Sequence, residues 1–229
     1  MTKRTGVLIH GRHVKARGWE DIVWGNPAEG ILGQVPKGLL LALAEDVSLI
    51  YWGTGASERD GLKESEYTFQ YTLDHGDDLR VLPEFDIFNN WGEIGEWVKN
   101  RSFIDKETQN TTQEVERAAK MCMEKGILRL YLVSSPSHIA RCHMEALKLQ
   151  AAGKISSDLE IMATASQTPF ANSTLADVAI FEPPHRGDDP MIDVDPGLWP
   201  SRVLPRIFKL PVDKRVELLA RLNQELPKT

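Results

Sequence analysis

The stretch ILRLYLVSSPSHIAR, residues 127–141, decides the predicted fold. Ile127 to Val133 is a nearly continuous apolar run, which is typical of a strand inside a parallel sheet that is covered on both faces. Ser134-Ser135-Pro136 ends this strand, because Ser135 suits the N-cap of a helix and proline suits its first position. The helix that follows, to about Gln150, has four inward positions: Ile139, Cys142, Ala146 and Leu149.

A second helix is predicted immediately before this strand. Its inward positions, Val115, Ala118, Ala119 and Cys122, have the i, i+3, i+4, i+7 spacing of one buried helix face. Thr111-x-x-Glu114 fits a capping box, in which a hydroxyl and a carboxylate bind free backbone amides reciprocally. Gly126 is suited to end the helix. Helix, strand and helix therefore follow one another as in a βα-repeating fold.

The same alternation extends over most of the chain. We expect strands at 6–11, 47–52, 127–133, 159–163 and 178–181, helices at 36–45, 60–73, 86–100 and 213–226, and mainly loop at 12–35. This order predicts an α/β fold: a Rossmann-like three-layer sandwich with a mostly parallel sheet. The strands around 6–10, 47–52 and 127–133 should be central. One domain over 1–229 is expected, with less regular structure in 151–229, where 182–210 is rich in proline.

Composition narrows the class of protein. The formal charge of −6 argues against non-specific nucleic-acid binding, which needs a basic surface. No apolar run approaches the roughly 20 residues that span a bilayer, and Val7-Leu8-Ile9 is too short for a signal-peptide core. Cys122 and Cys142 fall at apolar helix positions, which predicts buried free thiols and not a disulfide. A cytoplasmic protein without membrane or nucleic-acid partners is expected.

Four segments should meet at one edge of the sheet, because ligands of open parallel sheets bind outside the carboxyl ends of the strands. They offer glycines, helix N-termini that suit anions, carboxylates, imidazoles and arginines. The first segment contains His10, Gly11, Arg12 and His13; the second Gly53, Thr54 and Gly55, with Glu64 and Glu66 downstream; the third Asp105, Thr108, Asn110 and Thr111; the fourth Ser134, Ser135, His138 and Arg141. The segments predict a small-molecule site.

Each feature also has a purely structural interpretation. Tight turns select glycine, helix capping explains Thr111 and Ser135, and Glu66 could face solvent. His138 lies in the first turn of a helix, where the helix dipole would lower the pKa of an imidazolium, but a hydrogen-bonded structural histidine fits the pattern too. The acidic residues Asp188, Asp189, Asp193 and Asp195 lack the spacing of a calcium loop.

Several established motifs are missing from the sequence. It contains no G-x-x-x-x-G-K-[ST], no G-x-G-x-x-G after the first strand and no G-x-S-x-G. A P-loop and an α/β-hydrolase nucleophile elbow are therefore excluded. His138 and His143 are five residues apart and cannot form H-E-x-x-H, so no metal site is predicted.

Two segments resemble those of the YdcF-like (ElyC/SanA/YdcF) family. They are Thr108-Gln109-Asn110-Thr111 and the run from Leu132 to Arg141; Gly53-Thr54-Gly55, Ser65-Glu66 and Asp105 match further family positions. The resemblance covers about 6–150 and implies a Rossmann-like sandwich with a pocket for a nucleotide-like ligand such as S-adenosylmethionine. Roles at the cell envelope have been proposed for members, although no membrane anchor is expected here. His10-Gly11-Arg12 stands where the family has Gly-Gly, and 68–105 is longer than usual.

Two functions remain open from the sequence. The first is an enzyme, a transferase or a hydrolase, that acts on a small anionic or nucleotide-like substrate. His138 would be its general acid or base, and Glu66 or Asp105 would orient a ribose, an imidazole or a metal-bound water. The second is a non-catalytic small-molecule binder or pathway accessory protein that uses the same pocket. Neither the substrate, the cofactor nor the oligomeric state follows from the sequence.

Overall fold

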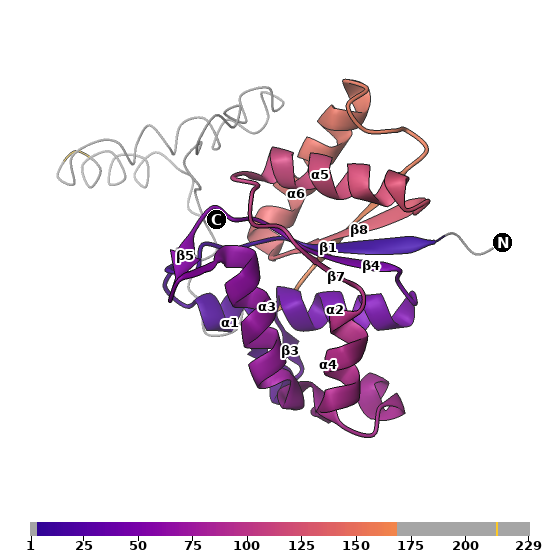
Figure 1. Ribbon diagram of the computed structural model, residues 1–229. Helices are drawn as coiled ribbons and strands as arrows, with labels where there is room; N and C mark the ends of the chain where they lie inside the picture. Colours follow the sequence, from indigo (N-terminus) through magenta and orange to yellow (C-terminus); the bar gives the residue numbers. More distant parts are fainter. Residues whose placement is uncertain (1–3, 169–213, 215–229) are drawn as a thin grey trace, which may run out of the picture. The chain divides into compact units, whose positions relative to one another are not determined.

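The structure is a computed structural model that describes residues 4–168 and Lys214 (Figure 1). The chain divides into two units, Met1–Ile180 and Phe181–Thr229, and residues 4–168 all belong to the first. The strand expected at 178–181 and the helix expected at 213–226 lie outside the described residues, except for Lys214. A single domain over the whole chain therefore stays a prediction.

Five parallel strands form the central sheet. In chain order they are β1 (Thr5–Ile9), β4 (Leu49–Trp52), β7 (Ser102–Ile104), β8 (Arg129–Ser134) and β9 (Glu160–Ala165), and in space they are ordered β7-β4-β1-β8-β9. The strand order reverses between β1 and β8, which is the topological switch point of a doubly wound sheet. The α/β Rossmann-like fold is therefore confirmed, and so is the central place of β4, β1 and β8.

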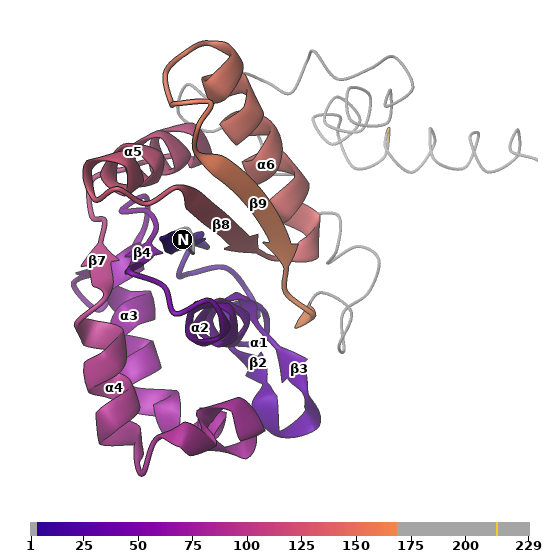
Figure 2. The ribbon, with the colours of Figure 1, turned by 90° about the vertical axis from the view of Figure 1, so that its right-hand side faces the viewer.

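Helices cover both faces of this sheet (Figures 1 and 2). On one face lie α2 (Gln34–Ala44), α3 (Glu64–His75) and α4 (Trp91–Lys99), and on the other lie α5 (Thr111–Glu124) and α6 (Pro136–Ala151). Alternating residues of β1 explain the two cores, since successive side chains of a strand point to opposite faces. Val7 and Ile9 pack in the core under α2, whereas Leu8 packs in the core under α5 and α6. No helix within residues 4–168 is long and apolar enough to cross a membrane.

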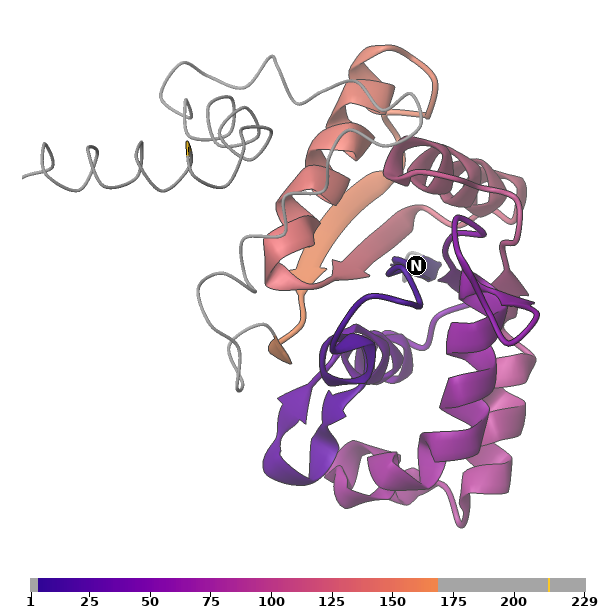
Figure 3. The same cartoon turned by 90° about the vertical axis from the view of Figure 1, so that its left-hand side faces the viewer.

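The connection between β1 and α2 is more regular than predicted. Instead of mainly loop, it contains α1 (Trp19–Val23), the two-residue strands β2 (Gly25–Asn26) and β3 (Ile31–Leu32), and the 3-10 turn η1 (Pro27–Glu29), visible in Figure 3. Its tryptophans explain the difference, because Trp19 and Trp24 are both buried in the core. Burial of these two rings stabilises a segment whose glycines suggested only turns.

Three further boundaries differ from the prediction. The helix expected at 60–73 begins at Glu64, because β5 (Glu58–Arg59) and β6 (Leu62–Lys63) form a hairpin around Asp60-Gly61. Both turn residues have positive φ, 53° and 79°, as in the type I′ turn that Asp-Gly favours. The helix expected at 86–100 is limited to α4, preceded by the 3-10 turns η2 (Gly76–Val81) and η3 (Pro83–Ile87). The short edge strand β7 was not predicted.

Candidate functional site

The carboxyl ends of β4, β1 and β8 are joined by backbone hydrogen bonds. The His10 amide donates to the Val133 carbonyl at 3.0 Å, and the Gly53 amide donates to the Ile9 carbonyl at 3.0 Å. The side-chain amide of Gln34, at the start of α2, donates to the His10 carbonyl at 2.5 Å. His10 is thus fixed at the switch point between β1 and β8, the place where open α/β sheets bind ligands.

Glu114 of α5 binds the first residues after β1. One carboxylate oxygen, Oε2, lies 2.7 Å from Nδ1 of His10, and the other, Oε1, accepts the Gly11 amide at 3.0 Å. His10 is 1% exposed and Glu114 is 3% exposed. The buried Glu114 carboxylate therefore fixes the orientation of the His10 imidazole. The pair is stable together because burial of either charged group without the other would be costly.

This contact replaces the capping box predicted for Thr111 and Glu114. The N-cap of α5 is Asn110, whose side chain accepts the Gln113 amide at 2.9 Å. Thr111 is the first residue of the helix, one position too late for the cap. The Glu114 carboxylate therefore does not cap the helix, and its two oxygens bind the residues that follow β1 instead.

A second imidazole and a thiol adjoin His10. The rings of His10 and His138 are edge-to-face with centroids 6.1 Å apart, and Nε2 of His138 lies 3.4 Å from the Thr111 hydroxyl. Cys142, one turn after His138 on α6, interacts with both imidazoles and is fully buried. Among the described residues, Nε2 of His10 therefore makes no hydrogen bond of ordinary geometry, although the His10 ring interacts with Cys142.

These contacts set opposite pKa shifts at the imidazole and the thiol. Burial lowers the pKa of His10, but the charges of Cys142 and Glu114 outweigh it and raise this pKa to about 10. Burial raises the pKa of Cys142, but His10 and His138 outweigh it and lower this pKa to about 6. Each group thus favours the charged form of its neighbour, because opposite charges on His10 and Cys142 stabilise one another.

The glycines of the predicted site leave room for protein groups. A Cβ at Gly53 would lie 1.5 Å from Oε1 of Glu114, and a Cβ at Gly55 would lie 1.9 Å from the Lys106 carbonyl oxygen. At Gly11 the nearest atom would be Cγ2 of Thr54, at 2.0 Å. Their small size is thus required for the strand-end loops to pack together. Whether they also contact a ligand stays a prediction.

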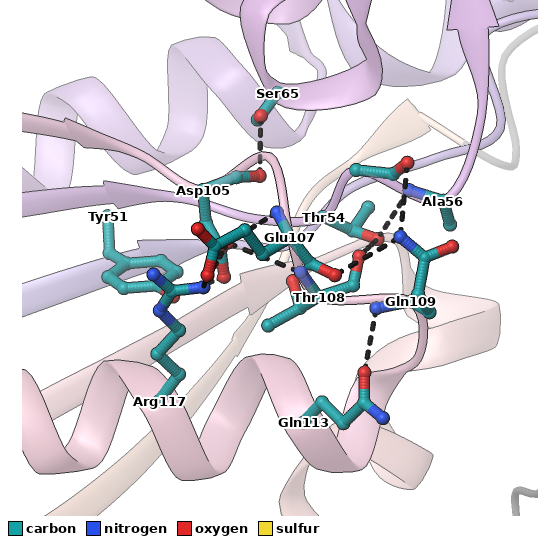
Figure 4. Close-up of polar contacts among 11 residues, drawn as sticks. Tyr51, Thr54, Ala56, Ser65, Asp105, Glu107, Thr108, Gln109, Gln113 and Arg117 are labelled. Carbon is teal, nitrogen blue, oxygen red and sulfur yellow. Dashed lines mark hydrogen bonds and ion pairs between the residues drawn. The ribbon is translucent and has the colours of Figure 1, made fainter.

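Asp105 is the centre of a second polar network (Figure 4). Its buried carboxylate accepts the Tyr51 hydroxyl, the Glu107 and Thr108 amides at 2.9 and 3.3 Å, and a guanidinium N–H of Arg117 at 3.1 Å. With these donors around it, the carboxylate holds the 105–110 loop in place. The catalytic role expected for Asp105 stays a prediction, and its geometry is that of a structural anchor.

The Thr54 turn is attached to the same loop. Its hydroxyl and the Gly55 amide both donate to the Thr108 carbonyl, at 3.1 and 2.8 Å. These bonds hold Thr54 at φ 69°, a conformation that β-branched residues rarely adopt. The second and third predicted segments are thereby joined, and Thr111 joins the third to His138.

The remaining predicted residues have local roles in the structure. Glu66 accepts the Lys63 amide at 3.1 Å and pairs with Lys106 at 3.2 Å. Ser135 is the N-cap of α6 as predicted, but its side chain makes no capping bond, and its carbonyl accepts the His138 amide at 2.9 Å. Ser134 is buried, and the Arg12 carbonyl accepts the Trp19 indole N–H at 3.1 Å. Arg141 lies partly buried on α6.

The four predicted segments therefore lie together, but Glu114 and Cys142 were not predicted as site residues. The spacing of four between His138 and Cys142 places both on one face of α6, which the sequence could have indicated. Nothing local to Glu114 indicates its contact with β1. Within residues 4–168 and Lys214, no three His, Cys, Asp or Glu side chains are arranged to hold a metal ion.

Comparison with known proteins finds no matching family model, no similar curated protein and no similar solved structure. The resemblance to the YdcF-like family therefore stays a prediction.

Proposed function

We propose that this protein is an enzyme that acts on a small anionic or nucleotide-like substrate, with His10 and His138 as its acid–base groups. The observation that carries the proposal is the His10 imidazole: buried, held by Glu114, without an ordinary hydrogen bond at Nε2, and located at the switch point of the sheet. A carboxylate that accepts Nδ1–H orients the ring, and the raised pKa of His10 makes its Nε2–H the proton donor of the pair of imidazoles.

His138 retains its predicted role in this proposal and gains a partner. It is more exposed than His10, and it faces the Thr111 hydroxyl and the His10 ring. Two imidazoles in unlike environments, one buried beside a carboxylate and one nearer to solvent, suit the separate tasks of accepting and returning a proton. Group transfer and hydrolysis both need such a pair.

The anionic class of substrate is supported by the groups around the imidazoles. The N-termini of α5 and α6 lie at this edge of the sheet, and Arg141 follows His138 by three residues. In α6, Pro136 lacks an amide proton and the His138 amide is already bonded to Ser135, so this helix offers fewer free amides than predicted. An anionic group would therefore rely on Arg141 and the imidazoles. An S-adenosylmethionine-type ligand is implied only by the YdcF-like resemblance.

A thermal-shift panel of nucleotides, sugar phosphates and S-adenosylmethionine tests for the ligand. A compound present at 100 times its Kd stabilises the folded state by about 2.7 kcal/mol, which corresponds to roughly 5–10 °C in Tm for a protein of this size. The absence of a shift with every anionic compound, at concentrations that would detect millimolar binding, contradicts the proposed substrate class.

Variants then separate the roles of the site residues. His138→Ala should lower turnover by roughly 10²- to 10⁴-fold while the ligand still binds. Arg141→Ala should instead weaken binding of an anionic ligand by roughly 1.5–3 kcal/mol. His143→Ala is the matched control, because His143 lies on the same helix outside the cluster. Equal turnover by the His138 and His143 variants would contradict the catalytic role.

A non-catalytic binding protein is the second candidate. The observation that favours it is the burial of the polar cluster, since His10 is 1% exposed and protein atoms occupy the space beside Gly11 and Gly53. In that case His138→Ala and His10→Asn would bind the ligand as tightly as the wild type. No compound of the panel would then be consumed by the wild-type protein.

A further inference from the structure

The Cys142 thiol differs from the other thiol of this chain in its surroundings. The chain has two cysteines, both free and both fully buried. Cys122 lies in the core under α5, where burial raises its pKa to about 12. Cys142 belongs to the same core and also interacts with His10 and His138. The two thiols are therefore equally buried, but Cys122 has an apolar environment whereas that of Cys142 includes two imidazoles.

We propose that Cys142 is a site of oxidation by small hydroperoxides, assisted by the two imidazoles beside it. Two observations outside its own ionisation carry this. The spacing of His138 and Cys142 places them on one face of α6, and the rings of His10 and His138 are edge to face with centroids 6.1 Å apart. In addition, Nε2 of the buried His10 makes no hydrogen bond of ordinary geometry with any described residue, so this nitrogen can bind a small polar molecule close to the sulfur.

The chemistry needs only hydrogen peroxide as co-reactant. The thiolate sulfur attacks one peroxide oxygen, the S–O bond forms and the O–O bond breaks. The leaving hydroxide takes a proton from an imidazolium and departs as water. Sulfur gives up two electrons and becomes a sulfenic acid, while the peroxide is reduced. His10 and His138 favour the thiolate at the start and are placed to supply the proton at the end.

Burial restricts the reagent and does not prevent the reaction. Hydrogen peroxide is close to water in size, and His138, which interacts with Cys142, is only partly buried. The lower pKa gives Cys142 far more thiolate at neutral pH than Cys122 has, although each thiolate is less nucleophilic. The larger thiolate fraction outweighs the lower nucleophilicity, so Cys142 should be oxidised more than about tenfold faster than Cys122. The proposal does not depend on the proposed function.

Wild-type protein provides the test, because trypsin cuts after Lys120, Lys125, Arg141 and Lys148 and separates the two thiols. The folded protein is treated with hydrogen peroxide for a series of times, quenched with catalase, unfolded and alkylated with iodoacetamide without reductant. The loss of alkylated 121–125 and 142–148 gives the two oxidation rates. Cys142 should be lost more than about tenfold faster than Cys122, and the rates should become similar in denaturant. Equal rates in the folded protein, or faster loss of Cys122, overturn the proposal.

The contribution of the imidazoles is tested separately. His138→Asn should slow oxidation of Cys142 by at least about threefold, whereas His143→Asn, a change next to Cys142 in the chain, should not. Circular dichroism and Tm establish that each variant is folded. An unchanged rate in folded His138→Asn and folded His10→Asn overturns the assistance by imidazole. If these variants do not fold, the comparison of Cys142 with Cys122 in the wild type decides alone.

Discussion

Replacing Glu114 by glutamine removes the carboxylate that joins α5 to the end of β1. In the wild type its oxygens accept from Nδ1 of His10 at 2.7 Å and from the Gly11 amide at 3.0 Å. Glutamine has nearly the same shape, but only one of its two terminal groups accepts, so one buried donor loses its partner. Hydrogen bonds to charged groups contribute about 1.5–3 kcal/mol each, and breaking a buried ion pair costs about 3–5 kcal/mol. We therefore expect Glu114→Gln to lower the free energy of unfolding by about 2–4 kcal/mol.

Urea unfolding followed by circular dichroism at pH 7 measures this loss. Glu124→Gln is the control, because Glu124 is exposed at the end of the same helix and its replacement should change the free energy of unfolding by less than about 0.5 kcal/mol. A capping role for Glu114 would predict about 1 kcal/mol and an equal loss for Thr111→Ala. A loss below about 0.5 kcal/mol in Glu114→Gln, or equal losses in the Glu114 and Thr111 variants, would refute the reasoning.

Two further predictions concern the other buried charges. Asp105→Asn should lower the free energy of unfolding by about 1.5–3 kcal/mol in urea titrations, whereas Glu107→Gln at the exposed neighbour should change it by less than about 0.5 kcal/mol; equal effects would contradict the anchoring role. The raised pKa of His10 stabilises the fold below its ordinary value of 6.5, and this contribution is lost as the pH rises through about 10. The lowered pKa of Cys142 stabilises the fold above its ordinary value of 9.0, and this contribution is lost as the pH falls through about 6. The two slopes cancel between pH 6.5 and 9.0 in the wild type. In Cys142→Ser the thiol contribution is absent, so stability should fall with rising pH from 6.5 up to the pKa that Glu114 alone gives His10, by at most about 1.4 kcal/mol per unit; parallel urea-derived curves for the two proteins would contradict this.

The central sheet could be predicted because its strands are apolar on both sides. Val7 to Ile9 and Ile127 to Val133 contain almost no polar residue, which in a chain with intervening helices leaves a covered parallel sheet as the main solution. The 12–35 connection was harder to predict than the sheet. Its glycines indicate turns, and its tryptophans indicate buried structure only once their neighbours in the core are known. Asp60-Gly61 is a local signal for a hairpin, but the predicted helix at 60–73 included these two residues.

The convergence of the four segments could be predicted from the sequence, but the contact between Glu114 and His10 could not. Parallel strands bring their carboxyl ends to one edge, so the convergence of the segments follows from topology alone. The partner of Glu114 is His10, more than a hundred residues away, and the local sequence offered the carboxylate a plausible use at the helix start instead. Asn110 also satisfied the capping rule, one position earlier than the residue chosen. Capping rules identify the side chains that could bind the helix start, but only the tertiary structure determines which of them does so.

The energetics of the cluster around His10 argue for a function. A buried carboxylate, two imidazoles and a thiol could be replaced by apolar side chains of similar volume at little loss of stability, and often with a gain, because each buried charge loses its hydration. The surrounding core of Leu8, Leu132 and Ala146 shows that apolar packing is available at this position. Stability alone therefore does not account for the cluster. Its place at the switch point between β1 and β8, where open α/β sheets bind ligands, favours the proposed function.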